Sequence, residues 1–176
     1  MPLSLIIFIG LFGVLLVLFF KNPIINRLGE NNKMVHKLQT ANWYQNYWLA
    51  GIFLFGMNAV LFFATIGILY LLMFLIIPFI HIFIMLLAVF GSIYLWIIIN
   101  KAWQGTKRNR LKMGAIGSSF YLILTVLFVF LFVTLKPSYP GEDTFMKAIG
   151  LLFAIIVTAV ACITCFVFTG FSQRKV

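Results

Sequence analysis

Cys162 and Cys165 form the one spacing in this chain that resembles a chemical motif. In soluble redox proteins, a C-x-x-C pair lies at a helix N-terminus, where the helix dipole lowers the thiol pKa. Here the pair lies near the C-terminal end of a charge-free apolar run, where the dipole has the wrong sign to stabilise a thiolate. A single pair also supplies only two of the four ligands of a structural zinc site. The pattern therefore favours packing over redox or metal chemistry.

The two cysteines lie within a series of small residues spaced three or four apart along the same apolar run. Small residues at this spacing allow membrane helices to approach one another closely. The series predicts a helix-packing face that consists of Gly150, Ala154, Thr158, Ala161, Cys165 and Thr169.

Asn58 and His81 are isolated polar residues in a second apolar run, and together they are a possible intramembrane polar site. Ionisable groups inside a membrane are costly and often functional, although a neutral imidazole can also bond a neighbouring helix. If the chain turns near residues 69–70, the two side chains lie at equal depth and can pair. If it turns near Phe74, His81 lies close to the outer surface and the pair fails. Asn58 alone is typical of a hydrogen bond between helices.

A third polar group is a strongly basic segment between two apolar runs, with Lys101, Lys107, Arg108, Arg110 and Lys112. Basic residues at a membrane surface attract anionic headgroups by about 1 kcal/mol each. The segment can also contact an acidic partner, or can serve only to fix the orientation of the chain. Nucleic acid is not an expected partner, because no basic groove with stacking aromatic residues accompanies these charges. We expect no catalytic residue, no cofactor and no metal.

The elements that position these residues are membrane spans. The chain is 64% apolar and 9% charged, whereas soluble domains are about 45–50% apolar and about 25% charged. A helix needs about 20 apolar residues to cross the bilayer core. The sequence predicts an all-α integral membrane protein, one membrane domain over residues 1–176. Its five transmembrane helices are expected at about 3–20, 47–70, 77–100, 113–135 and 145–171.

The distribution of basic residues predicts the orientation of these spans. With the N-terminus outside, the segments 21–46, 101–112 and 172–176 are cytoplasmic and hold 11 of the 13 Lys and Arg residues. Because basic residues collect in cytoplasmic loops, this bias favours an outside N-terminus and a cytoplasmic C-terminus. Apolar residues on one face near residues 32–42 also predict a short amphipathic helix at the cytoplasmic interface.

The sequence favours a non-enzymatic accessory or interacting subunit of a larger membrane complex. Its expected partners are a bilayer with anionic headgroups, and another membrane protein or a second copy of the chain. The alternative is a small oligomeric transporter or channel with a polar path near Asn58 and His81. An enzyme that acts on lipids ranks last, because paired acid and base groups at one depth are absent. The Phe-, Ile- and Lys-rich composition is typical of a multi-pass protein of the bacterial inner membrane.

Overall fold

A computed structural model describes residues 33–75, 80–137 and 143–171, and these residues contain helices and no strand. The predicted first span, residues 3–20, and the tail 172–176 lie outside the described residues. The described elements, in chain order, are α3 (Lys33–Gln39), the 3-10 helix η1 (Asn42–Gln45), α4 (Tyr47–Leu75), α5 (Ile80–Ala102), α6 (Lys107–Val133) and α7 (Phe145–Gly170).

Four of these helices, α4 to α7, are long and apolar enough to cross a membrane. The shortest, α5, has 23 residues, which at about 1.5 Å per residue gives about 35 Å. This length exceeds the hydrocarbon thickness of about 30 Å. The fold is therefore that of a multi-pass helical membrane protein.

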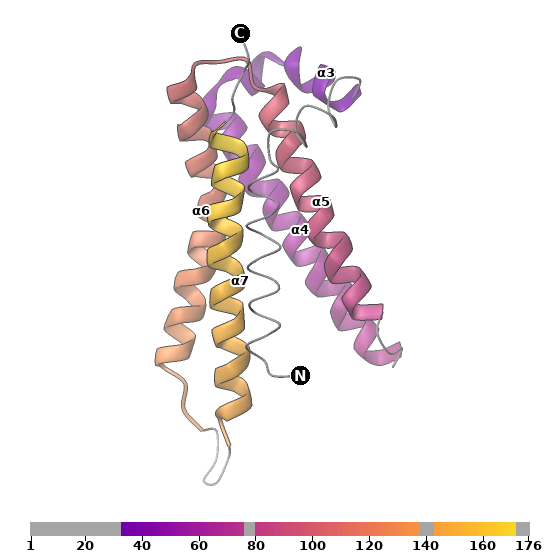
Figure 1. The fold of residues 1–176 in the computed structure, drawn as a ribbon, viewed down its shortest axis with the longest axis vertical. Helices are drawn as coiled ribbons and strands as arrows, with labels where there is room; N and C mark the ends of the chain where they lie inside the picture. Colours follow the sequence, from indigo (N-terminus) through magenta and orange to yellow (C-terminus); the bar gives the residue numbers. More distant parts are fainter. Residues whose placement is uncertain (1–32, 76–79, 138–142, 172–176) are drawn as a thin grey trace.

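The four long helices are arranged as two hairpins, α4–α5 and α6–α7, which lie together at one end and diverge toward the other (Figure 1). We call the first end the capped end, because α3, η1 and the connection 103–106 lie there. The opposite end, where α4 leads into α5 and α6 into α7, is the far end. The two ends differ in packing, and this difference organises the rest of the molecule.

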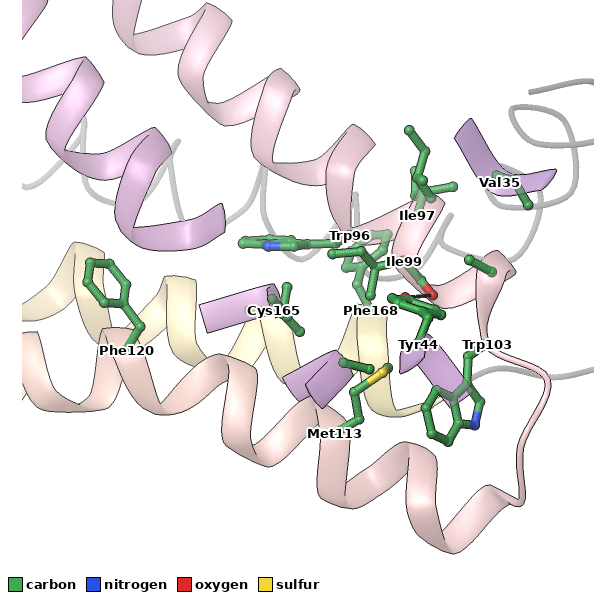
Figure 2. Packing of buried hydrophobic residues seen from close by; sticks show 14 of the residues in the cluster. Val35, Tyr44, Trp96, Ile97, Ile99, Trp103, Met113, Phe120, Cys165 and Phe168 are labelled. Atoms are coloured by element: carbon green, nitrogen blue, oxygen red, sulfur yellow. Dashed lines mark hydrogen bonds between the residues drawn. The ribbon is translucent and has the colours of Figure 1, made fainter. Parts of the chain in front are cut away.

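The buried apolar core lies at the capped end (Figure 2). It combines the start of α4, the end of α5, the first half of α6 and the end of α7, with η1 and α3 beside them. Its members are Val35, Tyr44, Ala50, Leu54, Trp96, Ile97, Ile98, Ile99, Ala102, Trp103, Met113, Phe120, Tyr121, Cys165 and Phe168. At the far end, large apolar side chains on all four helices are exposed, as expected of a surface that faces lipid or another protein.

Glycines allow α4 and α6 to approach closely within this core. A Cβ added at Gly117 would lie 2.2 Å from Leu54 Cδ2, and one at Gly51 would lie 2.8 Å from Ile116 Cβ. Both distances are far shorter than carbon atoms tolerate. The contact between the two hairpins therefore requires glycine at these positions.

The helix boundaries differ most from the predicted spans at the end of α4, which extends to Leu75 instead of residue 70, and at the start of α6. This helix begins at Lys107, so most of the predicted basic loop is helical and the connection is confined to residues 103–106. Thr106 Oγ1 accepts a hydrogen bond from Asn109 N at 3.3 Å, which is the geometry of an N-cap. Hydropathy misses this turn because Lys and Arg are good helix formers despite their charge.

The predicted amphipathic helix corresponds to α3, and its apolar face contacts the protein. Val35 is buried in the core, Leu38 packs against it, and Met34 is exposed. Gln39 Nε2 donates a hydrogen bond to Lys101 O at 3.2 Å. Gln45 Oε1 accepts one from Gln104 N at 3.2 Å. These bonds hold α3 and η1 against the end of α5.

Candidate functional site

Asn58 is a buried polar side chain with hydrogen bonds to three other helices. Its Nδ2 donates to Gly117 O at 3.1 Å and to Cys165 Sγ at 3.5 Å. Its Oδ1 accepts from Trp96 Nε1 at 2.9 Å. The side chain is fully buried. One amide on α4 therefore joins α5, α6 and α7, and we call Asn58 with these three partners the Asn58 node.

In the Asn58 node, the polar groups form hydrogen bonds with one another between helices. Asn58 is otherwise buried among apolar neighbours. A buried amide with satisfied donors and acceptor contributes stability, whereas an orphaned one costs about 1–3 kcal/mol. This geometry is that of a structural hydrogen bond between helices. It is also the role that the sequence favours for Asn58 when it acts alone.

His81 does not share the depth of Asn58. It is exposed in the first turn of α5 at the far end, whereas Trp96, which bonds to Asn58, lies 15 residues further along the same helix. That separation corresponds to about 22 Å along the helix axis. The structure thus separates the two residues, because α4 extends to Leu75 and α5 begins at Ile80.

The small residues predicted as a packing face on α7 lie at different levels of the bundle. Thr158, Cys165 and Thr169 are buried, and Ala154 and Ala161 are half-buried. Thr125 Oγ1 of α6 donates to Thr158 Oγ1 at 3.0 Å. Thr169 Oγ1 would lie 3.0 Å from a Cβ added at Gly114 of α6. The middle and the capped end of the series therefore pack against α6 of the same chain.

Gly150, the first member of that series, has a different environment. It is exposed, and a Cβ added there meets nothing within 4 Å. Among the described residues, no other helix packs against Gly150 of α7.

The two cysteines are free thiols with structural contacts. Cys165 is buried in the Asn58 node, and Cys162 Sγ donates to Ser118 O at 3.5 Å. Ser118 and Ser119 also donate to carbonyl oxygens of their own helix. Within the described ranges, no group of three His, Cys, Asp or Glu side chains is placed to hold a metal ion.

Tyr44 and Asn100 add two buried hydrogen bonds at the capped end. Tyr44 Oη donates to Ile99 O at 2.9 Å, and Asn100 Nδ2 donates to Phe168 O. Burial raises the pKa of Tyr44 above its ordinary value, and the charge of Arg110 offsets part of this effect. The phenol therefore stays protonated at physiological pH and remains a donor.

The basic residues of the capped end have unequal environments. Arg110 is buried, and its Nη2 donates to Trp103 O at 3.2 Å. Lys112 Nζ lies 5.0 Å from the ring centroid of Tyr47, a cation–π distance. Lys107 and Arg108 are exposed in the first turn of α6, and Lys101 is half-buried at the end of α5. In the predicted basic segment, Arg110 is therefore buried and has a structural role, whereas the other basic side chains form a mostly exposed surface.

Sequence reasoning missed several residues that shape this end of the molecule. Trp96, Trp103 and Asn100 lie in or beside apolar stretches that were interpreted only as span or boundary. Gly51 and Gly117 were not recognised as points of close helix approach. Their position alone does not identify them, because Gly56 lies in the same half of α4 and a Cβ added there meets nothing within 4 Å.

Comparison with known proteins assigns no relative to this chain. No protein-family model matches it, and neither a curated protein nor a solved structure does.

Proposed function

We propose that this protein is a non-enzymatic accessory subunit of a larger membrane complex, with its capped end in the cytoplasm. The observation that supports this proposal is that the buried Asn58 side chain makes hydrogen bonds to three other helices. A buried amide that bonds three other helices acts as structural glue, and none of its partners is a general acid, a general base or a metal.

The orientation follows from the charges of the capped end. Residues 33–46 and 101–112 contain seven Lys and Arg residues and no Asp or Glu. Basic residues near the ends of spans are retained on the cytoplasmic side during insertion. We infer an outside N-terminus, five spans including residues 3–20, and location in a bacterial inner membrane.

The far end offers the surface for a protein partner. Phe83 and Phe90 on α5, and Phe63 on α4, expose more than 60% of their surface. Phe83 and Phe90 are seven residues apart, so they lie on one face of the helix. The packing face of α7 is already used by α6, which makes the α4–α5 hairpin the better candidate for contact with another span.

The test is purification of the tagged chain from native membranes in a mild detergent, with mass spectrometry of bands at equal amount. We expect one partner that is lost in the variant Phe83→Ala/Phe90→Ala and retained in Phe130→Ala/Val133→Ala, a matched change on α6. Recovery of the chain alone, or equal loss in both variants, would contradict a specific subunit contact on α5.

The orientation has its own test, which does not depend on a partner. A single cysteine is placed at Lys107 or at Lys136 in a chain whose native cysteines are replaced by alanine. A membrane-impermeant maleimide applied to intact cells should label position 136 and leave position 107 unlabelled. The reverse pattern would invert the proposed topology.

A further inference from the structure

Trp103 carries a buried donor without an acceptor in the described structure. The residue is fully buried, and its Nε1 is a side-chain nitrogen with no hydrogen-bond partner. The other buried tryptophan, Trp96, donates its N–H to Asn58 Oδ1. A buried donor left unpaired costs about 1–3 kcal/mol, so an oxygen acceptor at Trp103 is expected.

Gly105 lies directly over this donor. A Cβ added at Gly105 would lie 2.7 Å from Trp103 Cζ2 and 3.2 Å from Nε1. Figure 2 shows the indole nitrogen directed toward the segment that joins α5 to α6. Gln104, Gly105 and Thr106 are exposed. Among the described residues, the exposed segment 104–106 therefore lies beside the donor and has no side chain at Gly105.

The same segment leads into a helix N-terminus of unusual charge. The first turn of α6 begins with the exposed residues Lys107 and Arg108 and contains no acidic residue. Cations at a helix N-terminus are unfavourable, because the dipole is already positive there. The first N–H groups of a helix lack intrahelical acceptors, and Thr106 takes only that of Asn109. An anion beside this turn would relieve the repulsion and accept the free N–H groups.

We propose that the 103–108 segment binds a phosphate group, held by Trp103 Nε1, the first turn of α6 and the side chains of Lys107 and Arg108. The phosphate belongs to an anionic lipid headgroup or to free phosphate, since both present the same oxygens. Entry requires a small displacement of Gly105, which has no side chain to obstruct it. The proposal rests on the proposed placement of the capped end at the membrane surface, and it is independent of the accessory role.

The experiment uses the full chain in nanodiscs and measures the melting temperature. Nanodiscs of phosphatidylcholine are compared with discs that contain increasing phosphatidylglycerol, and inorganic phosphate is titrated separately into phosphatidylcholine discs. We expect the wild-type melting temperature to rise with one of these additions. The variant Trp103→Phe should need about tenfold more of it, because a charge-assisted hydrogen bond is lost.

Two further variants provide controls. Trp96→Phe also removes an indole, but one whose N–H is already bonded to Asn58, so its response to the added phosphate should equal that of the wild type. Arg108→Gln, at an exposed position, should weaken the response, and Lys37→Gln on α3 should not. Because Arg108 is on the surface, this pair keeps the test valid even if Trp103→Phe does not fold.

The outcomes distinguish a lipid headgroup from free phosphate as the bound group, and they also show whether the proposed site exists. A response to phosphatidylglycerol alone assigns a lipid headgroup, whereas a response to inorganic phosphate in neutral discs assigns free phosphate. No response of the wild type to either addition, or equal responses of the wild type and Trp103→Phe, would overturn the proposal and leave water as the acceptor. Maleimide labelling at position 107 reports separately whether the capped end faces the cytoplasm.

Discussion

The capped end and the far end are made from the same four helices, yet different interactions hold them. At the capped end, Asn58, Asn100 and Tyr44 bond across elements, and glycines bring α4 onto α6. At the far end, the described polar bonds lie within a single helix or within one hairpin, as for Thr65, whose hydroxyl donates to Leu61 O. Apolar side chains there remain exposed.

This difference shows what holds membrane helices together. Lipid tails are as apolar as leucine, so burial of apolar surface gives little preference for a helix neighbour over lipid. Close packing at small residues and hydrogen bonds between helices do give such a preference. The two hairpins are therefore joined where Gly51 and Gly117 allow close contact and Asn58 bonds across helices, and they diverge at levels where Gly67 and Gly150 contact no other helix.

The largest expected effect tests the close approach of α4 and α6. Gly117→Val should destabilise the fold by about 3 kcal/mol, because the new side chain overlaps Leu54. Gly67→Val is the matched change at an exposed far-end position with nothing within 4 Å, and it should change stability by less than about 0.5 kcal/mol. Unfolding in mixed detergent micelles measures both. Similar values would mean that the two ends do not differ in packing.

The next largest effect concerns the Asn58 node. Asn58→Leu should cost about 2 kcal/mol, because it orphans the Trp96 N–H in the core. Adding Trp96→Phe removes that orphan, so the double variant should be less destabilised than the sum of the two single variants. Strict additivity in the same unfolding assay would show that the two side chains are not coupled.

Tyr44→Phe should have a smaller effect, of about 1 kcal/mol. The ring stays in the core and only the hydrogen bond to Ile99 O is lost. Because burial raises the Tyr44 pKa in the folded protein, the bond contributes fully below the ordinary tyrosine pKa of about 10. The contribution is lost only as pH rises through the higher folded-state value. The variant's deficit should thus be equal at pH 6 and pH 8, and a deficit that disappears at pH 8 would contradict this assignment.

Thr125→Val should have the smallest effect. It removes the bond from Thr125 to Thr158 within the α6–α7 hairpin, and bonds of this kind in membranes average about 0.6 kcal/mol. Its effect should be confined to this hairpin, so the double variant with Asn58→Leu should be additive. A strong coupling between the two variants would contradict this expectation, because it would link the far half of the α6–α7 hairpin to the Asn58 node.

The sequence predicts the positions of the membrane helices better than it predicts which helices pack against one another. A bilayer demands a continuous apolar helix, so composition and run length identify α4 to α7 directly. The choice of partner depends on single residues. Asn58 is recognisable as a bond between helices, but its acceptors are a backbone carbonyl at Gly117 and a thiol at Cys165, which no sequence pattern specifies.

The candidate polar site was harder to predict because it depends on where one hairpin turns. No polar residue marks the connection between α4 and α5, and a shift of a few residues moves His81 from the depth of Asn58 to the far end. The small residues on α7 also left open which helix they contact. They predict a packing face, but not whether α6 of the same chain or another protein covers that face.

The Asn58 node also has a consequence for biosynthesis. Asn58 is made 59 residues before Gly117 and 107 residues before Cys165. At about 5–20 residues per second, the ribosome needs about 5–20 s to supply the last partner. Trp96, only 38 residues away, comes within the first hairpin and can shield the amide oxygen earlier. The Trp96 indole can thus hydrogen-bond the Asn58 side chain before α6 and α7 are synthesised. Without it, the amide would remain unpaired in lipid until translation ends.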